Sequence, residues 1–110
     1  MYVVIRKFRN MHSLHEAARR AKVGLAPILT QTPGFKAYYI FDGGNGVGGS
    51  VTLFESRESA MVASQSSLLW LKENLADLYE GEPELTSGEV LASARLSRRR
   101  AGPRMTPARP

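Results

Sequence analysis

Two strand-like stretches on either side of a glycine-rich segment limit the fold more than any other feature of this chain. The first stretch, FKAYYIFD, spans residues 35–42, and the second, SVTLFE, spans residues 50–55. Both are rich in β-branched and aromatic residues, which are typical of strands. Asn45-Gly46 between them is a favoured two-residue turn, because both positions accept positive φ angles. We therefore expect a β-hairpin, with Gly48-Gly49 forming a bulge or a close backbone approach at the start of its second strand.

The same segment also matches the spacing of a nucleotide-binding loop. Gly44, Gly46 and Gly49 are arranged as G-x-G-x-x-G, the pattern of dinucleotide-binding folds. In those folds the glycines open a helix that holds the pyrophosphate, and an acidic residue about 20 positions later binds the ribose. Here a strand pattern follows the glycines, and Leu69 and Trp70 occupy the position expected for the acid. The segment is therefore interpreted as a hairpin turn, and no nucleotide is expected.

Helical periodicity predicts one helix before the hairpin. Ser13 and Glu16 form a capping box, in which the serine hydroxyl accepts a hydrogen bond from the amide of residue 16. Pro27 removes a backbone donor, so we expect a kink there or a restart after Gly24. The predicted apolar stripe consists of Leu14, Ala17, Ala21, Leu25 and Ile28, and the element ends at Thr32-Pro33-Gly34.

A second helix is predicted after the hairpin, with Ser56 as its N-cap and Glu58 in its first turn. Gly81-Glu82-Pro83 stops the helical pattern. Its predicted buried face consists of Met61, Ser64, Leu68, Leu71, Leu75 and Leu78.

Two further strands, at residues 2–8 and 84–93, complete the order β-α-β-β-α-β. This order predicts an α+β fold with a ferredoxin-like protomer and a four-stranded antiparallel sheet. Both helices then cover one face of the sheet, and the other face should be polar in a monomer. The alternation in residues 35–41 and 2–5 instead makes both faces apolar. We therefore expect a homodimer in which two copies pack sheet to sheet.

The basic charge of the chain belongs to its C-terminal end. Six of the 15 Lys and Arg residues lie from Arg95 onward, where no acidic residue occurs. The other nine are matched by ten acidic residues, so the folded part is close to neutral. We expect a protomer at residues 1–94 and a basic, disordered tail at residues 95–110. Nucleic acid is expected to make only nonspecific contact, through the Arg95–Pro110 tail.

Several classes of site are excluded by composition. The chain has no cysteine, which excludes disulfides, thiolate catalysis and iron–sulfur clusters. The apolar run near the N-terminus, Tyr2 to Ile5, is too short for a signal peptide or a membrane helix. We therefore expect a cytoplasmic protein without membrane contact. His12 and His15 have no evident third ligand for a metal, so neither a metal nor a cofactor is expected.

Three stretches resemble a known superfamily, the dimeric α+β barrels. They are TPGFKAYYIFD, VTLFESRESA and WLKENL, and the resemblance covers Met1 to Ala94. Within that superfamily the chain is similar to the antibiotic biosynthesis monooxygenase group. The resemblance implies two ferredoxin-like protomers whose sheets form a barrel. The superfamily has several activities, so the resemblance implies a range of them, among which is cofactor-independent oxygenation of aromatic phenols.

The resemblance implies site residues as well. Characterised aromatic monooxygenases of this group place an Asn one helical turn before a Trp at the substrate cavity. This chain has Trp70, but Ser66 stands one turn before it and Asn74 one turn after it. Haem-degrading relatives use a histidine from the later part of the chain, whereas both histidines here come early. The resemblance therefore favours a small aromatic ligand over haem.

We take Trp70, Asn74 and Tyr39 as candidate catalytic residues lining a cavity. Alternatively, Trp70 packs against the edge of the sheet and Asn74 is a surface residue of the helix. Tyr38 and Tyr39 point to opposite faces of their strand, so one faces the helices and the other the expected interface. Arg6 lies on a covered strand and needs a partner, which is Glu55, Glu89 or an anionic ligand. The function expected is that of a phenol-directed monooxygenase or of a non-catalytic ligand-binding or stress-associated dimer.

Overall fold

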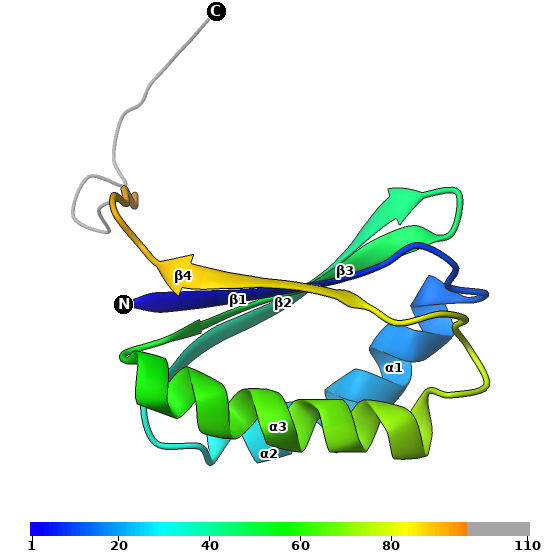
Figure 1. The fold of residues 1–110 in the computed structure, drawn as a ribbon, viewed down its shortest axis with the longest axis horizontal. Coiled ribbons are helices and arrows are strands. Elements are labelled where there is room, and N and C mark those ends of the chain that lie inside the picture. Colours follow the sequence, from blue (N-terminus) through cyan, green and yellow to red (C-terminus); the bar gives the residue numbers. More distant parts are fainter. Residues whose placement is uncertain (97–110) are drawn as a thin grey trace, which may run out of the picture.

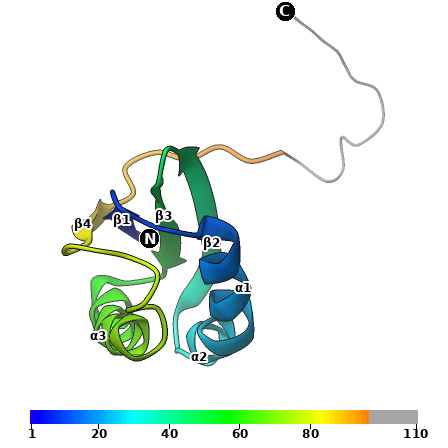
Figure 2. The same ribbon diagram turned by 90° about the vertical axis from the view of Figure 1, so that its right-hand side faces the viewer.

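The sheet contains four strands, β1 (Tyr2–Phe8), β2 (Phe35–Gly44), β3 (Val47–Phe54) and β4 (Glu84–Glu89). The computed structural model describes residues 1–96. The strand order is β2-β3-β1-β4, and each neighbouring pair is antiparallel. Three helices, α1 (Leu14–Gly24), α2 (Ala26–Thr30) and α3 (Arg57–Asn74), lie on one face of the sheet (Figures 1 and 2). This confirms the predicted ferredoxin-like α+β protomer.

The central hairpin has the predicted turn. Asn45 and Gly46 both have positive φ angles, 55° and 79°, as a two-residue hairpin turn of this kind requires. The two strands are longer than predicted, because β2 continues to Gly44 and β3 begins at Val47. Four of the five glycines, Gly43, Gly44, Gly48 and Gly49, therefore belong to the strands, and Gly46 belongs to the turn. A break in register between Asp42 and Gly44 marks a bulge near the end of β2.

The predicted close backbone approach also occurs, at the start of β3. A Cβ atom added to Gly49 would overlap the carbonyl oxygen of Arg6 on the neighbouring strand. One added to Gly48 would lie 2.7 Å from Leu14 Cδ1 of α1. It would also lie 2.7 Å from the backbone oxygen of Phe41 on β2. These two glycines are thus required by space, since a side chain would push β3 away from β1 or from β2.

The helix starts follow the predicted caps. The Ser13 hydroxyl accepts from the backbone amide of Glu16 at 3.3 Å, and Ser56 accepts from Ser59 at 3.2 Å. The first helical element ends at Gly24 and restarts as the short helix α2, with a proline in its first turn. The break predicted from Gly24 and Pro27 is therefore present.

The buried face of α3 differs from the predicted one. Its buried residues are Ala60, Ala63, Ser67 and Leu71, while Met61 is 53% exposed. The prediction is correct at Leu71, while Ser64 and Leu68 are half-buried, and Met61 is the one member of the predicted face that is exposed. Leu75 and Leu78 are buried as expected, although α3 ends before them at Asn74. Two smaller differences are Ile28, which is 40% exposed, and β4, which stops at Glu89 rather than residue 93.

The sheet has two apolar faces, of which the helices cover one. The helix-facing side carries the core, including Val4, Phe8 and Phe54. The opposite side, here called the outer face, carries Tyr39 and Phe41, which are 60% and 38% exposed. No helix or strand within residues 1–96 covers this outer face (Figure 2). Most of the predicted tail, residues 97–110, lies outside the described part of the chain.

Candidate ligand-binding site

Polar side chains occupy the centre of the helix-facing side of the sheet, where an apolar core is normal. Arg6 of β1 lies opposite Ser50 of β3, and one row further along, Thr52 of β3 lies opposite Tyr38 of β2. Directly paired residues of antiparallel strands project to the same face, so these four side chains share it. The alternation of Ser50 and Thr52 with apolar neighbours in β3 places both on this side.

Two serines of α3 complete what we call the polar cluster. Ser64 accepts a hydrogen bond from Arg6, and Ser67 is buried at 6% exposure. Small side chains on this face of α3 leave room between the helix and the sheet. The polar cluster therefore consists of Arg6, Tyr38, Ser50, Thr52, Ser64 and Ser67.

A cavity of about 40 Å³, here called the inner pocket, lies beside the polar cluster. Its apolar walls include Phe8 and Met11 near the end of β1, Leu14 and Leu25 around α1, and Leu71 of α3. All members of the polar cluster except Ser64 also line it. No histidine or carboxylate lines the inner pocket among residues 1–96. The pocket is thus a small apolar chamber with hydroxyl groups and one guanidinium in its wall.

Arg6 is buried, and no carboxylate among residues 1–96 pairs with it. The residue is 6% exposed, and its Nη2 donates to Ser64 Oγ at 3.2 Å and to the Ser64 backbone carbonyl oxygen at 3.5 Å. The expected pairing with Glu55 or Glu89 is not found in the described residues; Glu55 instead lies 3.6 Å from Lys36 Nζ. Burial lowers the pKa of Arg6 from its usual value, while the nearby tyrosines oppose this change. An arginine still keeps its charge at neutral pH.

Two buried hydroxyls of the polar cluster make no hydrogen bond with another group in residues 1–96. Thr52 is 7% exposed and Ser67 is 6% exposed. The great majority of buried side-chain polar groups have a partner, and leaving one without costs about 1–3 kcal/mol. Unsatisfied hydroxyls that line a cavity are suited to bind water or the polar end of a ligand.

Tyr38 faces the same chamber with a protonated hydroxyl. Burial raises the pKa of Tyr38 to about 12, and the charge of Arg6 only partly opposes this effect. The phenol therefore remains neutral at physiological pH and is available as a hydrogen-bond donor.

A second hollow opens beside the inner pocket, between α3 and the edge of the sheet. This hollow, here called the edge groove, has a volume of about 290 Å³. Leu85 and Ser87 of β4 form one wall and Ala60, Met61 and Ser64 of α3 form another. Ser64 lines the edge groove and also accepts the hydrogen bond from Arg6. The two hollows are therefore adjacent, and they meet at the contact between Arg6 and Ser64.

The three predicted site residues lie elsewhere. Trp70 sits between α1 and α3, where a Cβ atom on Gly24 would approach its Cζ2 to 2.8 Å. Asn74 turns its amide back along its own helix and donates to the Trp70 carbonyl oxygen at 3.0 Å. Tyr39 is 60% exposed on the outer face. None of the three lines the inner pocket or the edge groove. Their catalytic role stays a prediction.

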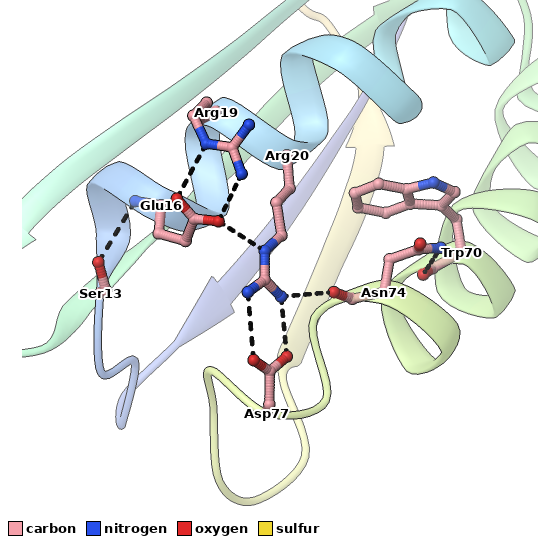
Figure 3. A network of polar contacts seen from close by, with 7 residues as sticks. All are labelled: Ser13, Glu16, Arg19, Arg20, Trp70, Asn74 and Asp77. Atoms are coloured by element: carbon pink, nitrogen blue, oxygen red, sulfur yellow. Dashed lines mark hydrogen bonds and ion pairs between the residues drawn. The ribbon is translucent and has the colours of Figure 1, made fainter.

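Trp70 and Asn74 adjoin a network of charges that joins α1 to the end of α3 (Figure 3). Arg20 of α1 donates to the Asn74 carbonyl oxygen at 2.9 Å and pairs with Asp77 at 2.8 Å. Hydrogen bonds from Arg19 and Arg20 lower the pKa of Glu16 to about 2. The guanidinium of Arg20 thus caps the last turn of α3, where a positive charge is favourable.

Sequence reasoning singled out Arg6 and Tyr38 but missed Ser50, Thr52 and Ser67. The signal was available in part, because Ser50 and Thr52 occupy alternate positions of a strand. The face of β3 that meets the helices depends on how β3 pairs with its neighbours. The sequence of one strand does not determine that register.

Neither a metal site nor a membrane span emerges from the described residues. Within residues 1–96 no three His, Asp or Glu side chains gather closely enough to hold a metal ion. His12 lies 2.9 Å from Glu80 in an exposed pair. No helix in this part of the chain has the length and apolar character needed to cross a membrane.

Solved structures with the same fold were found by comparison. A monooxygenase of Streptomyces coelicolor, solved with nanaomycin D, superposes with a TM-score of 0.70 at 18% identity, covering 87% of this chain and 92% of that one. SnoaB, a cofactor-independent oxygenase from Streptomyces nogalater, gives 0.65 at 13% identity, covering 84% and 94%. A Nitrosomonas europaea protein of unknown function gives 0.65 at 15% identity, covering 87% and 94%.

The sequence itself gives no further match. No protein-family profile and no curated protein sequence matches this chain. At such low identities the structural likeness shows the fold alone. That fold is the α+β barrel protomer of the antibiotic biosynthesis monooxygenase structures, as the sequence resemblance had implied.

Proposed function

We propose that this protein is a homodimeric α+β barrel that acts as a cofactor-independent monooxygenase on a small aromatic or phenolic compound. The observation that carries the proposal is the polar cluster, in which buried hydroxyls that have no hydrogen-bond partner among residues 1–96 face an apolar chamber. Small-molecule sites combine apolar walls with a few polar groups aimed at one point. The proposal places the oxygen of the substrate among the hydroxyls of Tyr38, Thr52 and Ser67.

The comparisons support the reaction class. Two of the structures that share the fold belong to a monooxygenase and to a cofactor-independent oxygenase. Another that shares it has no known function, so the fold by itself leaves the activity open. The fold alone therefore does not favour a ligand or a reaction, whereas the polar cluster offers hydrogen-bonding groups for the oxygen of a substrate.

The proposed chemistry requires little from the protein beyond binding. The substrate loses a proton to water, and its anion transfers electrons to molecular oxygen; the proton is taken up again when the second oxygen atom leaves. One oxygen atom then bonds to the substrate carbon, and the other leaves as water, so that a ring CH₂ group and O₂ become a C=O group and H₂O. Protein hydroxyls orient the substrate by hydrogen bonds to its oxygen, and the apolar walls exclude bulk water.

Trp70 and Asn74 enter this proposal as positioning residues. Trp70 fixes the spacing of α1 and α3, which form two walls of the inner pocket. The backbone carbonyl oxygen of Asn74 accepts a hydrogen bond from Arg20, where α1 meets the end of α3. Tyr39 belongs in the proposal to the contact with the partner protomer, because it projects from the outer face.

The dimer is proposed from the outer face. Tyr39 and Phe41 expose apolar surface beside strands whose alternate residues are also apolar. Large exposed apolar patches mark interaction surfaces. A second copy of the same sheet covers such a patch with matching apolar side chains.

Oxygen uptake with a panel of anthrone-like phenols tests the activity. We expect the parent to exceed the spontaneous rate, and we expect Tyr38→Phe and Thr52→Val to lower kcat/KM by about 10- to 100-fold, the range of one or two lost hydrogen bonds. Thr86→Val is the matched control, because Thr86 is an exposed threonine of β4 that lines neither hollow. A parent rate equal to the spontaneous rate for every phenol would remove the monooxygenase assignment.

One observation favours a second candidate, a non-catalytic ligand-binding or stress-associated dimer. Among residues 1–96, no side chain that commonly acts as a general base lines the inner pocket, and the volume of this pocket is only about 40 Å³. Calorimetric binding of a phenol without oxygen uptake, lost in Thr52→Val, would support this candidate over the enzyme.

A further inference from the structure

We propose that the ligand is an apolar acid, ionised at neutral pH, whose oxyanion pairs with Arg6 and whose apolar body lies in the edge groove. This inference rests on the proposed function. It adds the charge of the ligand and the place where its apolar body binds.

The guanidinium of Arg6 is buried and makes few hydrogen bonds within residues 1–96. A guanidinium has five N–H donors, yet among residues 1–96 only Ser64 accepts from it, through Nη2. Arg6 as a whole residue is buried, with a relative exposure of 6%. A buried charge is costly unless it is paired and hydrogen-bonded. The donors that Arg6 does not use are suited to the two oxygens of a carboxylate or to the oxygen of an acidic phenol.

The charges that line the two hollows favour an anion. No aspartate or glutamate lines the inner pocket or the edge groove in the described part of the chain. Arg6 lines the first hollow and Arg57 lines the second. An anion entering either hollow therefore meets only positive or neutral groups. The protonated hydroxyl of Tyr38 adds a donor near the same charge.

The two hollows differ in volume, and only one of them has room for a ring system. Ligand pockets have volumes of about 300–1,000 Å³, and about 10–15 Å³ is needed for a single water molecule. The inner pocket, at about 40 Å³, has room for a few water-sized groups. The edge groove, at about 290 Å³, approaches the size of a small-ligand site. A ring system fits the groove, and only the polar end of a ligand fits beside the polar cluster.

The edge groove also has the right surface for an apolar body. Tyr2 and Val4 of β1, Leu85 of β4 and Met61 of α3 contribute to its walls. Met61 and Leu85 are each 53% exposed, so their apolar surface is available to a ligand. Ser64 lies between this surface and the guanidinium of Arg6, at the point where ring and acid would join.

A matched pair of ligands tests the inference, with 2-naphthoate as the anion and 2-naphthamide as its neutral analogue. Binding of each is measured by isothermal titration calorimetry at pH 7. For the parent protein we expect naphthoate to bind at least about tenfold more tightly than naphthamide, because its bonds to Arg6 are charge-assisted. Arg6→Met should lose that preference and bind both compounds alike.

Two further variants serve as controls. Lys72→Met removes one positive charge from an exposed position of α3 and should keep the preference for naphthoate. Ser87→Trp places a large side chain in the wall of the edge groove. It should lower the affinity for both ligands by about tenfold or more. Thermal melting of every variant checks its fold. We expect Arg6→Met to melt no lower than the parent, since replacing an unpaired buried charge by an apolar side chain removes a cost.

The outcomes separate the inference from the proposed function. Equal binding of naphthoate and naphthamide by the parent would overturn the charge selection and leave the small-molecule site standing. Preference for naphthoate that survives Arg6→Met would overturn the assignment to Arg6. If Ser87→Trp binds both compounds as tightly as the parent, the ring does not bind in the edge groove. Failure of both compounds to bind would overturn this inference together with the site on which it rests.

Discussion

At the scale of single residues, Tyr38 gives a pH dependence that can be measured. Burial raises the pKa of Tyr38 from 10.0 to about 12. Because the folded protein holds this proton more tightly than the unfolded chain, the associated stability is complete below pH 10 and disappears as the pH rises through 12. A shift of this size corresponds to at most about 3 kcal/mol.

Ultraviolet difference titration checks this prediction. The absorbance of tyrosinate in the parent minus that in Tyr38→Phe should rise with a midpoint near pH 12 in the native protein. The same difference measured in concentrated guanidinium chloride should move to the ordinary tyrosine value of about 10. A native midpoint at or below that ordinary value would show that Tyr38 is accessible to water.

Individual residues also mark the limit of sequence reasoning. Tyr38 and Tyr39 are neighbours, and alternation correctly assigns them to opposite faces. Alternation alone does not say which face receives the helices, and the site candidate taken from the sequence, Tyr39, lies on the outer face. Thr52 of β3 pairs with Tyr38, and both line the inner pocket, so Tyr38 lies on the helix-facing side. That placement depends on how β2, β3 and the helices pack together, which no local pattern contains.

At the scale of elements, the contact between α1 and α3 depends on Gly24. This glycine is needed for space, because a Cβ atom would lie 2.8 Å from Trp70 Cζ2. Gly24→Ala should lower the free energy of unfolding by about 1–2 kcal/mol, despite the better helix propensity of alanine. Urea unfolding monitored by the fluorescence of the single tryptophan measures this change.

Gly88→Ala is the comparison for that measurement. No atom lies within 4 Å of a Cβ atom added at Gly88, so this variant should stay within about 0.5 kcal/mol of the parent. Equal stabilities of the two alanine variants would mean that Trp70 moves aside without cost.

Most elements could be predicted because their signals are local. The caps at Ser13 and Ser56 and the turn at Asn45-Gly46 each depend on a few adjacent residues. The buried face of α3 could not be predicted in the same way. Size and hydrophobicity pointed to Met61, whereas the sheet receives Ala60 and Ala63 because only small side chains allow this helix to approach it closely.

At the scale of the whole molecule, we predict that the outer face is buried in a dimer. The parent should sediment as a dimer at micromolar concentration in analytical ultracentrifugation. Tyr39→Lys should shift the equilibrium toward monomers, because it places a charge in a patch that is otherwise apolar. A parent that sediments as a monomer at these concentrations would contradict the prediction.

Val62→Lys is the matched control for the dimer. Val62 on α3 is 63% exposed, close to the 60% of Tyr39, but it lies on the layer opposite the outer face. The same charge introduced there should leave the sedimentation coefficient unchanged. Dissociation by both variants would point to a general effect of charge rather than to the sheet.

The glycine pattern of the central hairpin has a consequence for other chains with the same spacing. Gly44 and Gly46 have φ angles of 87° and 79°, and Gly49 has no room for a side chain beside Arg6. All three glycines of the G-x-G-x-x-G spacing are therefore explained by the turn and by the strand contact. Any chain that keeps this backbone will keep the spacing, whatever it binds. The spacing alone therefore does not distinguish a nucleotide-binding loop from a hairpin, and the element that follows the last glycine, helix or strand, separates the two.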